Sequence, residues 1–232
     1  MTTRAKISVD TLMISDVHLG YEFSRPQKLI ETLALYDFKQ LVLNGDIFDD
    51  LNFKRLNSDH WDVLSCIRQL TKTHKVVWVI GNHDGQASIL SRLIGVKVHD
   101  QYIWASGGKR YLAIHGHQFD RFISKNVIIG GAASMLYNMI KKFDRGEGGA
   151  ISHWIMENNR SWLRLSDEVA NKASAYGKMR GVDTVFCGHT HIARQDKING
   201  VSYYNSGCWV ESPSHLITIV GKKVTLVAVD WC

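Results

Sequence analysis

Five stretches of the chain share one pattern, an apolar run that ends in polar residues beside a glycine. The run from Val76 to Ile80 has no polar interruption and leads into Gly-Asn-His-Asp-Gly. A continuous, β-branched run of this length predicts a strand covered on both faces, as in the parallel sheets of α/β proteins. The other four stretches are TLMISDVHLG, LVLNGDIFDD, YLAIHGHQFD and TVFCGHTHIA, at residues 11–20, 41–50, 111–120 and 184–193. The pattern predicts an α/β fold with polar clusters at its strand ends.

Two longer stretches have the periodicity of helices. Apolar residues recur along one helical face over residues 128–143 and again over residues 155–176, and glycines near residue 148 separate the two patterns. We therefore expect a helical insert at about residues 119–180. Its apolar faces have two open interpretations. They either pack into the ordinary core, or they form a cap that holds an apolar or amphiphilic substrate.

The organisation of the chain predicts a single domain over residues 1–232. The sequence contains only two prolines, and it has neither a low-complexity tract nor an internal repeat. The N-terminus lacks the apolar region of a signal peptide, and no run approaches the roughly 18 apolar residues of a membrane span. Four widely spaced cysteines form no C-x-x-C pair, which is typical of reduced thiols. We therefore expect a cytoplasmic protein.

The charge distribution bears on the partners that we expect. The net charge is +6 and the isoelectric point about 9.1. Residues 121–180 contain ten basic and five acidic residues, a local net charge of +5. This balance suits an anionic small molecule or the inner face of a membrane, where we expect peripheral association as one alternative. Nucleic acid ranks lower, because no base-stacking or groove-reading motif accompanies the charge.

The polar clusters contain the side chains that bind transition metals. Six of the eleven histidines lie in the strand-end stretches: His18, His83, His115, His117, His189 and His191. Imidazole, carboxylate and amide donors suit Mn²⁺, Fe or Zn²⁺, whereas the lack of paired thiolates argues against a structural zinc site. Asp16 and His18, like His189 and His191, are two residues apart, so we expect each pair to project from one side of a strand. Asp46 could bridge two ions about 3.5–4 Å apart.

The motifs D-x-H, G-D-x-x-D, G-N-H-D, His-Gly and G-H-x-H follow one another along the chain. In this order they resemble the calcineurin-like metallophosphoesterase superfamily, over residues from about Thr11 to Glu211. HGHQFD, CGHTH and NSGCWVES are similar to its UDP-2,3-diacylglucosamine diphosphatase-like branch. The resemblance implies an α/β fold of two stacked β-sheets flanked by helices. It also implies a dinuclear metal-dependent hydrolase of a phosphoester or pyrophosphate bond.

The resemblance further implies which residues hold the two divalent ions, for which we expect Mn²⁺, with Fe or Zn²⁺ as alternatives. One ion would take Asp16, His18, Asp46 and His191. The other would take Asp46, Asn82, His115 and His189. In this ligand set Asn82 contributes a neutral oxygen.

His83 is not needed as a ligand, so we expect it to protonate the leaving oxygen, with Asp84 to orient it. We expect Asp49 to hold a histidine ligand in its tautomer. The diphosphatases carry arginine in place of His83, and similar sequences often have aspartate at Cys208. An alkoxide leaving group gains more from a general acid than a phosphate does. His83 therefore favours a phosphomonoester or phosphodiester, although a pyrophosphate stays open.

Two classes of function follow. The first is an enzyme acting on a phosphorylated small molecule, either a lipid-linked substrate of the UDP-2,3-diacylglucosamine (lipid A precursor) type or another phosphomonoester, phosphodiester or nucleotide. The second is a non-catalytic scaffold that keeps the fold and binds protein partners. All seven ligand positions and His83 are filled, which favours the enzyme.

Overall fold

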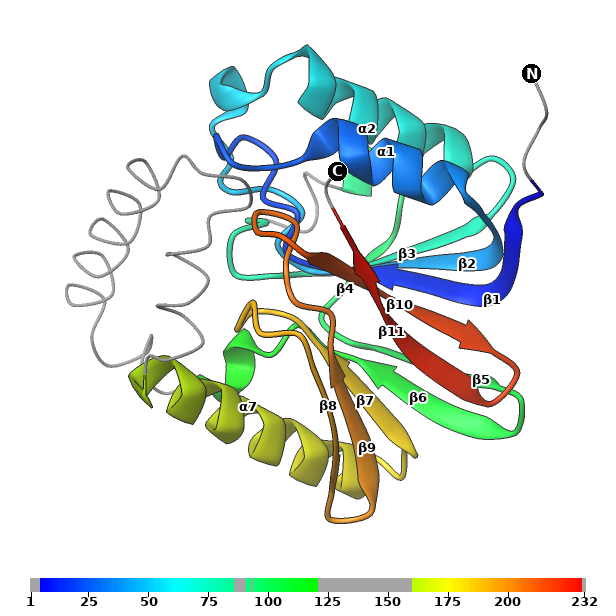
Figure 1. Cartoon of the computed structure of the whole chain (residues 1–232), viewed down its shortest axis with the longest axis vertical. Helices are drawn as coiled ribbons and strands as arrows, with labels where there is room; N and C mark the ends of the chain where they lie inside the picture. Colours follow the sequence, from blue (N-terminus) through cyan, green and yellow to red (C-terminus); the bar gives the residue numbers. More distant parts are fainter. Residues whose placement is uncertain (1–4, 86–90, 93, 121–159, 231–232) are drawn as a thin grey trace.

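The computed structural model describes residues 5–85, 91–92, 94–120 and 160–230. Its strands form two sheets (Figure 1). The six-stranded sheet has the order β11-β10-β1-β2-β3-β4, and the five-stranded sheet has the order β5-β6-β7-β9-β8. The strands of the first sheet are β1 (Ile7–Ile14), β2 (Tyr36–Asn44), β3 (Lys75–Val79), β4 (Val98–His99), β10 (Ser214–Val220) and β11 (Lys223–Val229). Those of the second are β5 (Tyr102–Ser106), β6 (Lys109–Ala113), β7 (Thr184–Cys187), β8 (Arg194–Ile198) and β9 (Val201–Asn205).

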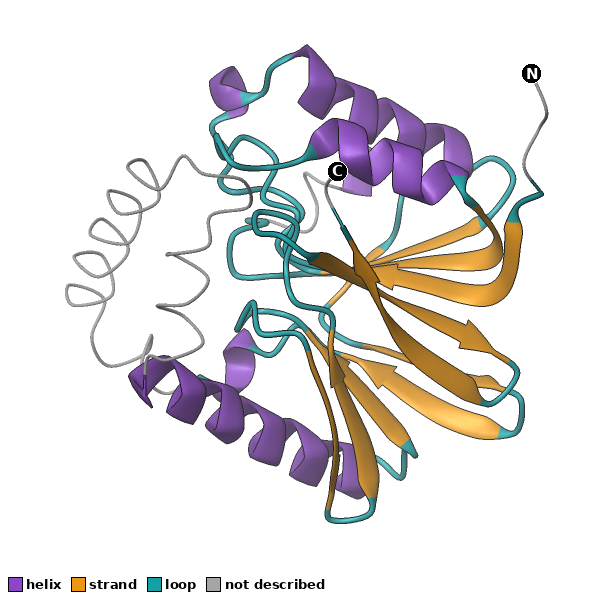
Figure 2. Ribbon diagram, in the orientation of Figure 1, coloured by secondary structure: helices purple, strands orange, loops and turns teal. Residues whose placement is uncertain are grey.

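The sheets are stacked, with helices on their outer faces (Figure 2). Helices α1 (Pro26–Ala34) and α2 (Ser58–Leu70) cover the six-stranded sheet, and α7 (Arg160–Met179) covers the five-stranded sheet. Two short 3₁₀ helices, η1 (Phe53–Arg55) and η2 (His117–Phe119), lie in loops. The expected α/β sandwich is therefore confirmed.

Three layers of core explain why the strand sequences are apolar without interruption. In β1, Leu12 and Ile14 pack under α1 and α2, whereas Met13 points between the two sheets. In β3, Trp78 faces the helices and Val79 faces the other sheet. Both faces of these strands are covered, so neither face has room for polar side chains.

Helix α7 confirms the second helical pattern from Arg160 onward and shows how its apolar face is used. Val169 and Ala173 are fully buried, and Ala170 and Ala173 belong to a cluster with Leu112 and Val185 of the five-stranded sheet. The apolar face of α7 therefore packs into the ordinary core, which was one of the two interpretations of the helical patterns. The pattern at residues 128–143 lies outside the described residues. Among the helices that the structure describes, none is long and apolar enough to cross a bilayer.

The parallel pairing of the strands brings the polar clusters together. Strands β1, β2 and β3 pair in parallel in one sheet, and β6 and β7 do so in the other. Hydrogen bonds then join the loops that follow these strands. Asp16 N donates to Gly45 O at 3.0 Å, and Gly188 N donates to His115 O at 2.9 Å. Trp209 N, in the loop between β9 and β10, donates to Asp16 O at 2.9 Å.

Candidate metal centre

Most of the predicted ligands have an unusual backbone conformation. Positive φ angles of 51–67° occur at Asp16, His18, Asp46, His189 and His191. In the described chain Asn199 is the one further non-glycine residue with positive φ. A left-handed conformation costs a side-chain-bearing residue about 1–2 kcal/mol. Five such residues at one place indicate that the surrounding structure holds these loops for a purpose other than stability.

The expectation that Asp16 and His18, and likewise His189 and His191, project from one side of a strand is wrong. Strand β1 ends at Ile14 and β7 ends at Cys187, so both pairs lie beyond their strands. Their side chains converge because the loops turn, and not because side chains alternate along a strand.

Two glycines make the tight approach of these loops sterically feasible. A Cβ atom added to Gly81 would lie 2.1 Å from Asp46 Oδ1. One added to Gly188 would lie 2.2 Å from Asp16 Oδ2. Neither carboxylate could keep its place beside a larger residue, so glycine is needed at both positions.

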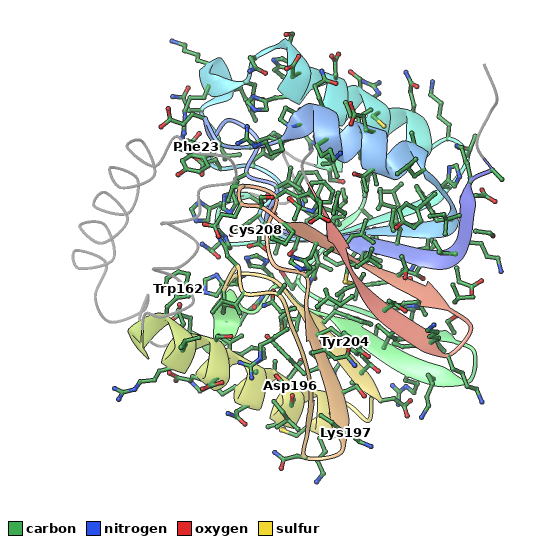
Figure 3. The ribbon with its side chains drawn as sticks, in the orientation of Figure 1. Phe23, Trp162, Asp196, Lys197, Tyr204 and Cys208 are labelled. Carbon is green, nitrogen blue, oxygen red and sulfur yellow. The ribbon has the colours of Figure 1, made fainter. Side chains whose placement is uncertain are left out.

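The first group of converging side chains contains Asp16, His18 and His191. One ligand atom of each lies within 4.8 Å of the others. His191 Nε2 is 3.3 Å from Asp16 Oδ1 and 3.1 Å from His18 Nε2. Cys208, which is labelled in Figure 3, is buried. Burial lowers the pKa of His191, while the neighbouring Cys208 and Asp16 together raise this pKa well above its usual value. The three side chains form a compact donor set.

The second group contains Asp46, His115 and His189, with the same spacing of ligand atoms. All three residues are buried. His115 Nε2 is 3.1 Å from Asp46 Oδ2, and His115 Nδ1 is 2.9 Å from Asn44 O. A carbonyl oxygen can only accept, so Nδ1 carries a hydrogen and Nε2 is the nitrogen that faces the carboxylate.

The contacts of His115 show that the second group fits a cation. Its Nε2 is buried and faces Asp46 Oδ2 at 3.1 Å, and no other described residue gives it a hydrogen-bond partner. In a neutral ring this nitrogen would present a lone pair to the lone pairs of Asp46, which is repulsive. Burial lowers the pKa of His115, but the charge of Asp46 outweighs burial and raises this pKa to about 9. The arrangement therefore favours positive charge between the two side chains, and a divalent ion supplies it.

The two carboxylates are ionised in spite of their burial. Burial raises the pKa of each, but neighbouring histidines outweigh it. His191 and His115 lower the pKa of Asp16, and His115 with His18 holds the pKa of Asp46 well below its usual range. Two buried carboxylates among histidines suit Mn²⁺, Fe or Zn²⁺.

Asn82, the remaining predicted ligand, lies in the loop that follows β3 and is exposed. The next residue anchors this loop to the second group, because His83 N donates to Asp46 Oδ1 at 2.8 Å. The loop is therefore beside Asp46, as the prediction requires. The ligand role of Asn82 stays a prediction.

Asp49 connects His83 to the first group. Its Oδ1 lies 3.4 Å from His18 Nδ1, and its Oδ2 lies 2.7 Å from Arg55 Nη1. Its carbonyl oxygen accepts from His83 Nδ1 at 2.7 Å. The expected contact between Asp49 and a histidine ligand is therefore present. The rings of His18 and His83 are 5.1 Å apart, which places His83 at the edge of the group.

The expectation that Asp84 orients His83 is wrong. The buried carboxylate of Asp84 accepts five hydrogen bonds, none of them from His83. The donors are the backbone N–H groups of Asp46, Ile47, Phe48 and Gly81 and the indole N–H of Trp78. Asp84 thus binds the loop that carries Asp46. The residue that orients the ring of His83 is Asp49, whose carbonyl accepts from His83 Nδ1.

Two further residues support the centre and were missed from the sequence. Asp120 Oδ2 lies 3.0 Å from His189 Nε2. Asn205 is fully buried, donates to Gly188 O at 2.7 Å and to Thr190 Oγ1 at 3.1 Å, and accepts from Gly207 N at 2.9 Å. Both lie inside motifs named above, Asp120 in HGHQFD and Asn205 in NSGCWVES.

His117, the sixth histidine of the strand ends, is half-buried beside the second group. Its ring lies 5.5 Å from that of His115 and 6.3 Å from that of His189. Burial and these two neighbouring histidines lower its pKa to about 4, so the ring is neutral at physiological pH.

Comparisons with known proteins identify the family and the fold of this chain. A family model for calcineurin-like phosphoesterases matches residues 10–193, which include all the predicted ligands. A novel archaeal phosphodiesterase has a similar structure, with 16% identity over 94% of this chain and 99% of its own, at a TM-score of 0.52. Vacuolar protein sorting 29 from Cryptosporidium parvum has 18% identity over 97% and 92% of the two chains, at a TM-score of 0.51. The phosphoesterase YfcE from E. coli has 16% identity over 95% and 99%, at 0.50. No curated protein matches the sequence significantly.

Proposed function

The chain belongs to the calcineurin-like phosphoesterase family and is a metal-dependent phosphoester hydrolase, and from this premise we propose that it cleaves a phosphomonoester or phosphodiester with an alcohol leaving group. The proposal includes two divalent ions and His83 as the general acid. The observation that carries it is the position of His83 at the edge of the centre.

We keep the ligand assignment that the family resemblance implies, and the two converging groups contain six of its seven residues. Asp16, His18, Asp46 and His191 would hold one ion, and Asp46, Asn82, His115 and His189 would hold the other. When bound, two such ions polarise phosphoryl oxygens and lower the pKa of a water molecule towards 7. The protein contributes a rigid frame, because the loops are fixed by Asp84, Asn205 and the two sheets. Such rigidity is what positioning in phosphoryl transfer requires.

The contacts of His83 suit proton donation to the leaving group. Its Nδ1 donates to the carbonyl of Asp49 at 2.7 Å, which fixes the ring and leaves Nε2 for the substrate. The residue is exposed, and its backbone N–H donates to Asp46 Oδ1, so His83 lies next to the proposed bridging ligand. A protonated Nε2 can donate to an alkoxide as the bond to phosphorus breaks. A phosphate leaving group would gain little from the same proton.

The substrate branch stays a prediction. A lipid-linked pyrophosphate would draw on the basic segment at residues 121–180, of which the structure describes residues 160–180. The membrane association and the cytoplasmic location stay predictions as well. The geometry of His83 favours an ester of an alcohol, and this preference can be measured.

The test compares His83→Ala with a matched control, His74→Ala, which precedes β3 at the end of the strand opposite the centre. We expect His83→Ala to retain its metals and to lose about 10²- to 10⁴-fold in kcat on an alkyl phosphomonoester, and much less on a nitrophenyl ester, because nitrophenolate leaves without a proton. A nucleotide-sugar pyrophosphate serves as the third substrate. An equal loss on all three would contradict acid catalysis by His83. Lack of hydrolysis by the parent with Mn²⁺, Fe²⁺ or Zn²⁺ would contradict the proposed function.

A further inference from the structure

Asp120 lies at the end of η2 and contacts a residue of the second ligand group. Its side chain is fully buried, and Oδ2 lies 3.0 Å from His189 Nε2, whose side chain is 6% exposed. The two residues are 69 positions apart and come from the loops after β6 and β7. The contact therefore joins two of the loops that build the centre.

Helix α7 holds Asp120 in place through η2. Lys172 Nζ donates to the carbonyl of Phe119 at 3.0 Å. The ring of Phe119 lies 5.9 Å from that of Tyr176, on the same face of the helix. The residue before Asp120 is thus fixed at its backbone and at its side chain.

The same helix also contacts the loop that carries His189. Trp162 lies in the first turn of α7 (Figure 3), and its indole N–H donates to Thr190 O at 2.8 Å. Thr190 stands between His189 and His191, so α7 supports this loop directly at Thr190 and indirectly through Asp120. The helix anchors the loop as well as covering the sheet.

The contact with Asp120 selects the metal-binding nitrogen of His189. An ionised carboxylate can only accept a hydrogen bond, so His189 Nε2 carries the hydrogen. The lone pair of the neutral ring is then on Nδ1. Asp120 is not part of the group formed by Asp46, His115 and His189, whose ligand atoms lie within 4.8 Å of one another. This separation agrees with a supporting role and not with that of a ligand.

We propose that Asp120 is a positioning residue that holds His189 with Nδ1 towards the second ion. This inference rests on the proposed dinuclear function. It also predicts that two histidines of one ion use opposite nitrogens. His115 is fixed through Nδ1 by the carbonyl of Asn44 and presents Nε2, whereas His189 is fixed through Nε2 and presents Nδ1. Each ring has one nitrogen held by the protein and one left for the metal.

The first test measures metal binding by titration calorimetry with Mn²⁺ for the parent, Asp120→Asn and Asp120→Ala. Loss of such an outer partner typically weakens metal affinity about 10- to 100-fold. We expect a loss of this size for one of the two ions in Asp120→Ala, a smaller loss in Asp120→Asn, whose amide oxygen can still accept, and an unchanged affinity for the other ion. Asp183→Asn is the control, because this carboxylate is bound to Lys109 far from the centre. Parent affinity for both ions in Asp120→Ala would overturn the proposal.

The second test reads the tautomer directly and needs neither metal nor activity. Two-bond ¹H–¹⁵N correlation spectra of the metal-free parent should show His189 protonated at Nε2 and not at Nδ1. They should show a hydrogen on His115 Nδ1, whether or not its Nε2 is protonated as well. A parent spectrum with His189 protonated at Nδ1 alone would overturn the proposal even if Asp120→Ala failed to fold. A parent that binds two Mn²⁺ ions but hydrolyses no phosphoester would contradict the proposed function without changing either result.

Discussion

Replacing Asp84 by asparagine tests how the centre is held, because Asp84 is the acceptor on which the loop after β2 depends. Its Oδ1 accepts from Ile47 N at 2.8 Å and Phe48 N at 3.1 Å. Its Oδ2 accepts from Asp46 N at 3.0 Å, and from Trp78 and Gly81. All five partners are N–H donors. An amide NH₂ is also a donor, so at either oxygen position it could accept none of these hydrogen bonds.

The expected cost follows from the better of the two amide orientations. With its oxygen at the Oδ2 position, asparagine keeps three donors and leaves Ile47 N and Phe48 N without an acceptor. Each buried unsatisfied donor costs about 1–3 kcal/mol, hence about 2–6 kcal/mol for the pair. Burial, with the nearby charge of Asp46, raises the pKa of Asp84, so removing the charge recovers part of its burial cost. We expect Asp84→Asn to lower the free energy of unfolding by about 2–4 kcal/mol.

Urea unfolding of the metal-free protein in a chelator measures this difference without a contribution from bound ions. Asp62→Asn is the matched control, since Asp62 is exposed on α2. We also expect Asp84→Asn to bind Mn²⁺ more weakly, because Asp84 holds the backbone of Asp46, a proposed ligand of both ions. A loss below about 1 kcal/mol with parent metal affinity would refute the assigned role of Asp84.

Three further predictions follow from the same contacts. Asp46→Ala should lose affinity for both ions, measured by elemental analysis after dialysis; one ion bound at parent affinity would argue against a bridging role. Gly188→Ala should lower metal affinity and stability together, by about 1–3 kcal/mol in unfolding free energy, because its Cβ would displace Asp16 Oδ2. Arg55→Ala should change stability by less than about 1 kcal/mol, since the pair with Asp49 is partly exposed, yet weaken Mn²⁺ binding several-fold in calorimetry. Unchanged binding would remove Arg55 from the support of His18.

The strands and the convergence of their ends could be predicted because burial on both faces leaves a direct trace in the sequence. Val77, Trp78 and Val79 must all be apolar when helices cover one face and a second sheet covers the other. Parallel pairing then places the residues after each strand at one edge. The identity of the clustered residues, histidine and aspartate, supplied the chemistry.

The supporting contacts could not be predicted in the same way. Asp84 accepts hydrogen bonds from backbone N–H groups that precede it by 36 to 38 positions in the sequence. Asp120 contacts His189, which follows it by 69 positions. A hydrogen bond between a side chain and a distant N–H group leaves no periodic pattern, so proximity in sequence suggested His83 as the partner of Asp84. The left-handed turns could not be predicted either. Aspartate and histidine also occur in strands, so their presence does not mark a left-handed residue.

Asp16 shows why the metal centre also bears on the fold. Its carboxylate accepts from His189 N at 3.0 Å, and its carbonyl accepts from Trp209 N at 2.9 Å. It thus ties the end of a strand in one sheet to the loop after β7 of the other. A cation held by Asp16 and His191 would draw the same two loops together, and binding to the folded state alone raises stability by mass action. The left-handed strain at both residues is therefore placed where bound metal can offset it.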